Sequence, residues 1–449
     1  MTSSHKLARL SVTFDDPSLI ANAGLILPAT LAHHLGVQQL ISDRVDLSGR
    51  VGAANTGLKA MTVISALLAG AEWIDDVDVL RAGASEAVCG HELRAPSTIG
   101  TWLRAFTWGH TRQLEAAAGA ALSGAWQAGA GPTASEAVTL DFDSTHCRTF
   151  GLGKQGGWKV DRHGERGYHP MIAVVDGYDQ IAATRLREGP ANDGRGVDSF
   201  ATEAINRVRT AGAGGRMAVR ADAGFFGRPL IEACRRADVR FSVTVRMNSY
   251  LREAIDGIDE DAWTDIPAGQ WQPNDGAAQV AETTIPAFSD EEEDVRLVVR
   301  RVNPKAAKAG EDPQLLPDWR HHAFITDITA TTTLDADAWH RAHAQVENVI
   351  KELKHHGGLA HLPSGVFAAN AAWLTLVALA HNLNRWTLRL GKGIDCWSSA
   401  KTIRRKLIAW PARITHHARQ TLLHGPTDWP WAHAVQFMLT QLRAIPAPT

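Results

Sequence analysis

One short segment restricts the fold of this 449-residue chain more than any other. Between residues 138 and 143, apolar and polar side chains alternate in the order Val-Thr-Leu-Asp-Phe-Asp. A period of two places successive side chains on opposite faces of a β-strand. The segment therefore predicts a strand with one apolar face and one polar face, and Asp141 and Asp143 share the polar face.

The residues after this strand continue a pattern of strands and helices. A second and a third apolar run flank a turn-like Gly-Tyr-Asp segment, which predicts a hairpin. Helical and extended patterns then alternate, so the predicted order is β-β-β-α-β-α-β. The predicted elements after the first strand are the strands His169–Asp176 and Gln180–Arg187, the helix Val197–Thr210, the strand Met217–Asp222, the helix Pro229–Ala237 and the strand Arg240–Met247.

The flanking regions differ from this centre. The first region is helical, and its segment near residues 80–106 is compatible with a helix-turn-helix or with an ordinary bundle element. Helices resume late in the chain, over Asp335–His356, Val366–Leu390 and a basic amphipathic segment Ser398–Leu423. We predict five regions: N-terminal helical 1–135, core 136–247, β-rich insertion 248–333, core 334–392, and basic helical C-terminal tail 393–449.

Composition is that of a globular protein, with 45 % hydrophobic and 21 % charged residues. The net charge of −2 hides a basic stretch, because residues 385–419 contain nine Lys or Arg and one acid, Asp395. Such a stretch suits phosphate contacts, and equally suits a solvated helix face. The four cysteines are far apart in sequence, which predicts reduced thiols. No signal-like or membrane-length apolar run is present, so we expect a cytoplasmic, nucleoid-associated protein without membrane contact.

Three acids from distant parts of the sequence suit phosphodiester chemistry. Two-metal catalysis needs several carboxylates at one point, because Mg²⁺ prefers oxygen ligands. Asp143 lies on the first strand, Asp222 ends the fourth, and Glu347 lies on a later helix. Each alone is weak evidence, since a strand-end Asp is usually a turn-former and a helical Glu usually a surface ion pair. Their combination with the strand order predicts a metal-binding triad, with Asp141 as the rival for the first ligand.

The helix around Glu347 has two stripes. Trp339, Ala342, Val346, Val349 and Leu353 follow the spacing of a buried stripe. An adjoining stripe contains His340, His343, Glu347 and Lys354, so a helix that packs on the sheet would direct Glu347 to the metals and Lys354 to a phosphate.

Several motifs resemble those of a known family. The segments are Thr139–Thr145, Gly167–Pro170, Leu186–Gly189, Arg220–Phe225 and Glu347–Lys354, with further similarity at Ser97–Phe106 and Pro411–Arg419. They resemble the DDE transposases of bacterial insertion sequences, in the IS-thirteen-eighty group, which is akin to piggyBac and IS-four-type transposases. The resemblance implies an α/β, RNase H-like core of the retroviral integrase superfamily with a β-rich insertion before the catalytic Glu. It assigns the triad to Asp143, Asp222 and Glu347, with Asp141 and Lys354 in support.

One departure concerns the helix of Glu347. Related transposases carry a Tyr and an Arg before the Glu, where this chain has His340 and His343, while the later Lys is matched by Lys354. Neighbouring Arg341 points away from that stripe, at about 160 degrees from His343 by the helical period of about 100 degrees per residue. The phosphate contact of the family's Arg is therefore not carried over.

The resemblance also implies function. We expect cut-and-paste transposition with two Mg²⁺ ions, or Mn²⁺ in their place, acting on terminal inverted repeats and target DNA. Paired ends imply a homodimer or a larger assembly. Alternatives are a DNA endonuclease without strand transfer, a non-catalytic protein that binds transposon ends, and, much less favoured, a chitinase-type glycosidase. The residues expected to contact DNA are Arg341, Lys351, Arg404, Arg405, Lys406, Arg413 and Arg419.

Overall fold

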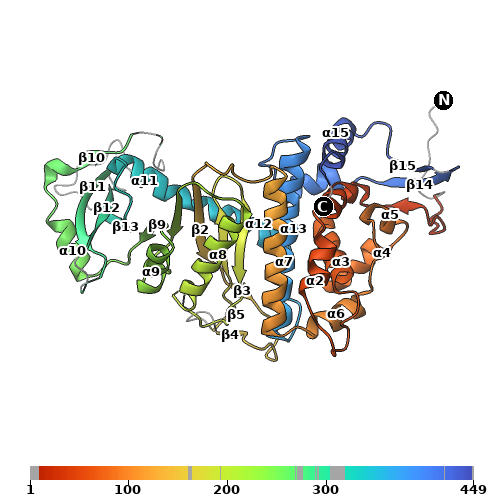
Figure 1. The fold of residues 1–449 in the computed structure, drawn as a ribbon, viewed down its shortest axis with the longest axis horizontal. Helices are drawn as coiled ribbons and strands as arrows, with labels where there is room; N and C mark the ends of the chain where they lie inside the picture. The colour runs from red at the N-terminus through yellow and green to blue at the C-terminus, as the bar shows by residue number, and fades with distance from the viewer. Residues whose placement is uncertain are drawn as a thin grey trace.

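The computed structural model describes residues 10–159, 164–192, 194–267, 269, 277–288, 290, 293–303, 319–418 and 420–446. The molecule is elongated, with a β-sheet in the middle, an antiparallel extension at one end and a helical region at the other (Figure 1). Within the described residues, no single helix is long and apolar enough to cross a membrane; one bent pair, Thr56–Ala69 with Ile74–Arg81, passes the same test when its two members are joined.

A nine-stranded sheet runs through the molecule in the order β10-β11-β12-β13-β9-β8-β2-β6-β7. The predicted strand at 138–143 is β2, the third strand from the β7 edge of this sheet, and β2, β8 and β9 are parallel to one another. β6 and β7 form the predicted hairpin. β6 runs antiparallel to β2, and β7 runs antiparallel to β6. The bounds are β2 Val138–Ser144, β6 Met171–Val175, β7 Gln180–Arg185, β8 Met217–Ala221 and β9 Arg240–Thr244.

The two faces of β2 have different neighbours, as its alternation predicts. Phe142 packs against Phe200 of α8 and Phe225, with ring centroids 5.2 and 6.4 Å apart. Asp141 and Asp143 point to the other face, which α12 covers (Figure 1). The bounds are α8 Val197–Ala211, α9 Arg228–Arg236 and α12 Gln345–His356.

The edge strand β7 is sealed by a long helix. Asn382 of α13 (Phe367–Gly391) accepts a hydrogen bond from the Ile181 amide at 2.7 Å and donates one to the Ile181 carbonyl at 2.8 Å. The amide side chain thus replaces a missing neighbouring strand, which an exposed edge would otherwise offer to another chain. α13 also packs on the N-terminal helices, so it joins the two halves of the molecule.

Helices form most of the N-terminal region, and they end in the long helix α7 beside β7. Ile99, Trp102 and Leu103 of α6 are fully buried, which accounts for the apolar pattern near residue 100. The bounds are α1 Ile26–His34, α2 Val37–Arg44, α3 Thr56–Ala69, α4 Val77–Arg81, α5 Ser85–Cys89, α6 Pro96–Arg104 and α7 Trp108–Gln127.

The described residues of the predicted β-rich insertion contain four strands and one α-helix. Its strands extend the central sheet, because β13 pairs with β9 in the register Phe324↔Thr244. A small second apolar core, which includes Val280, Val298 and Phe324, lies here. The bounds are α10 Ser249–Asp256, β10 Thr264–Asp265, β11 Ala277–Pro286, β12 Asp294–Asn303 and β13 Arg320–Thr326.

Two predicted helices were wrong in part. The helix expected over Asp335–His356 is broken into α11 (Thr333–Arg341), a 3₁₀ turn at Ala342–Ala344, and α12. The turn changes the helical phase, so His340, expected on the flank, is buried, whereas Trp339 is only half-buried. Val346, Val349 and Leu353 are buried as predicted.

The C-terminal helix expected over Ser398–Leu423 is wrong over its second half. After α14 (Ala400–Ile403) and a π-helical turn, the chain forms a hairpin of β14 (Ala412–His417) and β15 (Gln420–His424). Pro411 lacks the N–H that a helix needs, and β1 (Leu19–Ile20) supplies a partner strand from the other end of the chain. The last helix is α15 (Ala432–Arg443).

Candidate active site

The sheet places Asp143 and Asp222 on neighbouring parallel strands. β2 and β8 pair in the register Phe142↔Ala221, so Asp143 and Asp222 occupy the next register position. The carboxylate of Asp222 accepts the Gly224 amide at 2.9 Å, which forms the turn that ends the strand. Both carboxyl groups are partly buried at the same edge of the sheet.

Glu347 lies in the first turn of α12 and is exposed. Burial and, to a lesser extent, the negative charges of Asp222 and Glu347 together raise the pKa of Asp143 to about 6, although the Ser144 amide and His343 lower it. The fold thus brings three acids, separated by up to about 200 residues in sequence, into one electrostatic field. This edge, at the carboxyl end of β2, is called the active edge below.

The donor set suits a hard divalent cation, because all three groups offer carboxylate oxygens. The described residues contain no group of three or more His, Cys, Asp or Glu side chains closed around a single metal position. Asp222 and the exposed Glu347 both act electrostatically on Asp143.

Asp141 lies in a different environment from Asp143, although the two share a face of β2. Asp141 is 1 % exposed and receives Nε and Nη2 of Arg220 at 2.7 and 2.8 Å. Nδ1 of His343 lies 3.0 Å from the same carboxylate. Both oxygens of Asp141 are therefore occupied by protein groups.

Arg220 is the residue that sequence reasoning missed. It is fully buried in β8, and besides Asp141 it contacts Asp176 at 2.9 Å, donates to the Trp339 carbonyl, and lies 5.0 Å from the centre of the Trp339 ring. It therefore ties β2 and β8 to the end of α11, directly before the turn into α12. An arginine inside an otherwise apolar strand was the available signal. Arg220, Asp141, Asp176 and His343 are called the Arg220 network.

His340 and His343, at the positions of the family's Tyr and Arg, are both used inside the protein. The His340 ring contacts Ser242 at 2.7 Å and Thr244 at 3.0 Å and stacks on Phe324 at 4.0 Å. Burial lowers the pKa of His340 to about 3, so this ring is neutral. His343 serves the Arg220 network.

Lys354, in the last turn of α12, lies at the active edge. Its ammonium donates to the Thr145 hydroxyl at 3.0 Å, two residues beyond Asp143 along the chain. Ser144 contacts His169 at 3.0 Å on the other side. The motif around Asp143 is thus hydrogen-bonded to the motif at residues 167–170.

The residues expected to bind DNA differ in exposure and in their contacts within the protein. Arg341, Lys351 and Arg405 are exposed, and Lys351 lines a cleft of about 910 Å³ beside α12. Arg404, in contrast, donates to the carbonyls of Leu67, Leu68 and His356, at the ends of α3 and α12.

Of the remaining basic residues expected at DNA, Arg413 pairs with Asp16 at 2.7 Å and Lys406 lies 5.6 Å from the Trp431 ring centre. Arg419 lies outside the described residues. Some of the basic side chains in the C-terminal region therefore bind helix-end carbonyls or stabilise the β14–β15 hairpin.

Paired acids at one sheet edge and a third on a covering helix are compatible with a metal-dependent polynucleotidyl transferase or nuclease. The family model for "Transposase DDE domain group 1" matches residues 2–447. The chain belongs to this family and is a DNA transposase of the DDE class.

Other comparisons add little. The cryo-EM structure of the piggyBac transposase synaptic complex with hairpin DNA aligns over 95 % of this chain and 82 % of that chain, with 11 % identity and a TM-score of 0.45. No curated protein matches this chain.

Proposed function

We propose that Asp143, Asp222 and Glu347 hold two Mg²⁺ ions and that the chain cuts and joins DNA at the ends of an insertion sequence. The main support for this proposal is that Asp222 and Glu347 raise the pKa of Asp143, which means that the three carboxylates repel one another at the active edge. Divalent cations would relieve this repulsion, and when bound they would activate the attacking hydroxyl and stabilise the leaving oxygen.

The protein's own groups have separate roles in this proposal. Asp143, Asp222 and Glu347 supply oxygen ligands, and Lys354 offers its ammonium to a phosphate beside Thr145. Asp141 is a positioning residue, because its oxygens are held by Arg220 and His343. Through Arg220 it fixes the corner between α11 and α12, and so the direction of Glu347.

The strand order supports an RNase H-like core. Five strands in the order β7-β6-β2-β8-β9 have an antiparallel hairpin next to the central strand and two parallel strands beyond it, with α8 and α9 connecting them. The β10–β13 segment then interrupts the core between β9 and the helix of Glu347.

A test compares Asp143→Asn, Asp222→Asn and Glu347→Gln with Asp141→Asn. The assay incubates the protein with Mg²⁺ and DNA that carries the element's own ends, and maps broken and joined strands. We expect each triad variant to lose more than the roughly 10- to 100-fold typical of an outer partner, which is the range expected for Asp141→Asn. Equal losses at Asp141 and Asp143 would contradict the assignment of the first ligand, and breaks without joined products would favour an endonuclease.

Metal binding provides a readout besides activity. Mg²⁺ or Mn²⁺ should raise the Tm of the unaltered protein and of Asp141→Asn, by preferential binding to the folded state, but not of Asp143→Asn. A paired-end complex further predicts that two chains assemble on DNA ends, which mass measurement of the complex tests.

A further inference from the structure

Three long helices begin near one small pocket at the active edge. The pocket, of about 230 Å³, lies where β7 ends and where α7, α8 and α13 start. Met171 lines it and pairs with Ser144, the residue after Asp143. At about 30 Å³ per water it has room for a hydrated anionic group. Its lining residues are Trp108, Met171, Arg185, Leu186, Arg187, Glu188, Ala191, Arg195, Gly196 and Phe367.

The pocket is positively charged. Arg185, Arg187 and Arg195 face one acid, Glu188, across it. α7, α8 and α13 contain 20, 15 and 25 residues, and each directs the positive end of its helix dipole to this edge. Arg195 and Glu188 are exposed, whereas Arg187 is buried and donates to the carbonyls of His169 and Asn192.

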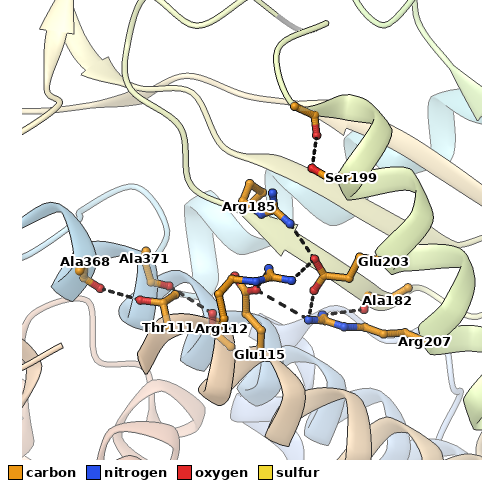
Figure 2. A network of polar contacts seen from close by, with 12 residues as sticks. Thr111, Arg112, Glu115, Ala182, Arg185, Ser199, Glu203, Arg207, Ala368 and Ala371 are labelled. Atoms are coloured by element: carbon orange, nitrogen blue, oxygen red, sulfur yellow. Dashed lines mark hydrogen bonds and ion pairs between the residues drawn. The ribbon is translucent and has the colours of Figure 1, made fainter. Parts of the chain in front are cut away.

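Arg185 of the pocket also belongs to a buried network that contains more arginines than glutamates (Figure 2). Glu203 receives Arg112, Arg185 and Arg207, and Glu115 contacts Arg112. Burial raises the pKa of Glu115 to about 7, so near neutrality this second acid is only partly ionised. These five residues are called the Glu203 network, and they set three guanidinium groups against fewer than two full negative charges.

One member of the network reaches the pocket. Arg185 lies 5.5 Å from the centre of the Trp108 ring, which Arg112 also approaches at 5.8 Å. Trp108 is 49 % exposed, and the buried Nε of Arg185 has no hydrogen-bond partner within the described chain. An exposed planar ring with guanidinium groups beside it suits the sugar-phosphate chain of DNA.

We propose that this pocket binds a phosphate of the DNA backbone next to the strand held at Asp143. The proposal rests on the proposed position of the active site. Arg195 and Arg185 neutralise the phosphate, Trp108 packs against the adjoining sugar, and the contact sets the register of the duplex at the catalytic acids. Phosphate contacts of this kind position DNA without reading its sequence.

The test measures DNA affinity against salt. Fluorescein-labelled duplex DNA is titrated with the full chain over a range of NaCl, using the unaltered protein, Arg195→Gln, and Arg209→Gln as a matched loss of one exposed charge at the other end of α8. Loss of one phosphate contact should weaken binding and lower the slope of log K against log salt by about 1 in Arg195→Gln only. An unchanged slope in Arg195→Gln would overturn the proposal.

A second variant separates the pocket from surface charge. Ala191→Leu fills the pocket without altering charge, so it should lower the slope as Arg195→Gln does, and a slope at the unaltered value would overturn the proposal. Asp143→Asn should lose cleavage and keep the salt slope. If Asp143→Asn cleaves normally, the proposed active site is wrong; if only the slopes fail to change, the pocket is wrong.

Discussion

Two buried networks of arginine and carboxylate flank the active edge, and they differ in whether their positive charge is balanced by carboxylates. In the Arg220 network one fully buried guanidinium contacts two aspartates and a helix carbonyl, and His343 contacts one of these aspartates. The Glu203 network sets three arginines against two glutamates and borders an opening.

The difference separates positioning from binding. Arg220 uses its donors on groups of β2, α11 and Asp176, the residue after β6, so it holds protein elements together and has no capacity for a ligand. Arg185 keeps one buried donor unused beside an exposed tryptophan. Charge that is satisfied inside the fold fixes geometry, whereas charge in excess at an opening attracts an anion.

The largest expected effect comes from breaking the two networks in parallel. Arg220→Gln should reduce the free energy of unfolding by about 3–5 kcal/mol, because it leaves the buried Asp141 carboxylate without its guanidinium. Arg207→Gln should reduce it less, because Glu203 keeps Arg112 and Arg185. Urea unfolding measures this loss. Cleavage by the folded fraction should fall strongly in Arg220→Gln alone, since only Arg220 fixes the corner before Glu347. Equal cleavage losses in both variants would remove the distinction between the networks.

A pH series sharpens the account of the Glu203 network. Because burial raises the folded pKa of Glu115 from 4.5 to about 7, its contribution to stability is fully present below pH 4.5 and is lost as the pH rises through 7. The isosteric Glu115→Gln should therefore gain about 3 kcal/mol relative to the unaltered protein between pH 4.5 and pH 8. Chemical unfolding at several pH values measures the difference. A constant difference across that range would show that Glu115 is ionised throughout.

A smaller effect is expected at His343. His343→Ala removes one hydrogen bond to the Asp141 carboxylate and should reduce the free energy of unfolding by about 1.5–3 kcal/mol. The salt dependence of DNA binding should not change, because this ring contacts Asp141 and not phosphate. A lower salt slope would restore the family's phosphate role to this position.

The smallest effects distinguish two neighbouring arginines. Arg404→Gln removes contacts to helix-end carbonyls and should reduce the free energy of unfolding by about 1–2 kcal/mol. The exposed Arg405→Gln should leave stability within about 0.5 kcal/mol. Thermal unfolding compares the two variants, and a larger loss at Arg405 would contradict the contacts assigned to Arg404.

Local patterns were enough for much of the sheet. The alternation at 138–143, the hairpin after it and the strand ending at Asp222 needed only the period of two and the turn residues, and β2, β6, β7 and β8 confirm them. The β-rich insertion was predicted in the same way. The position of Asp143 and Asp222 at strand ends follows directly, because parallel neighbours end at one edge.

What the sequence by itself determined was most strands of the central sheet and which acids stand at their ends. The tertiary structure alone decided that Asp141 is enclosed by Arg220 and His343 while Asp143 lies near the charges of Asp222 and Glu347. It also decided that a turn separates α11 from α12 and that β14 pairs with β1. Each of these depends on partners distant in sequence: Arg220, the Trp339 carbonyl, or the strand at Leu19. Periodicity reports which face a side chain occupies, but the group it meets there is fixed only when the whole chain packs.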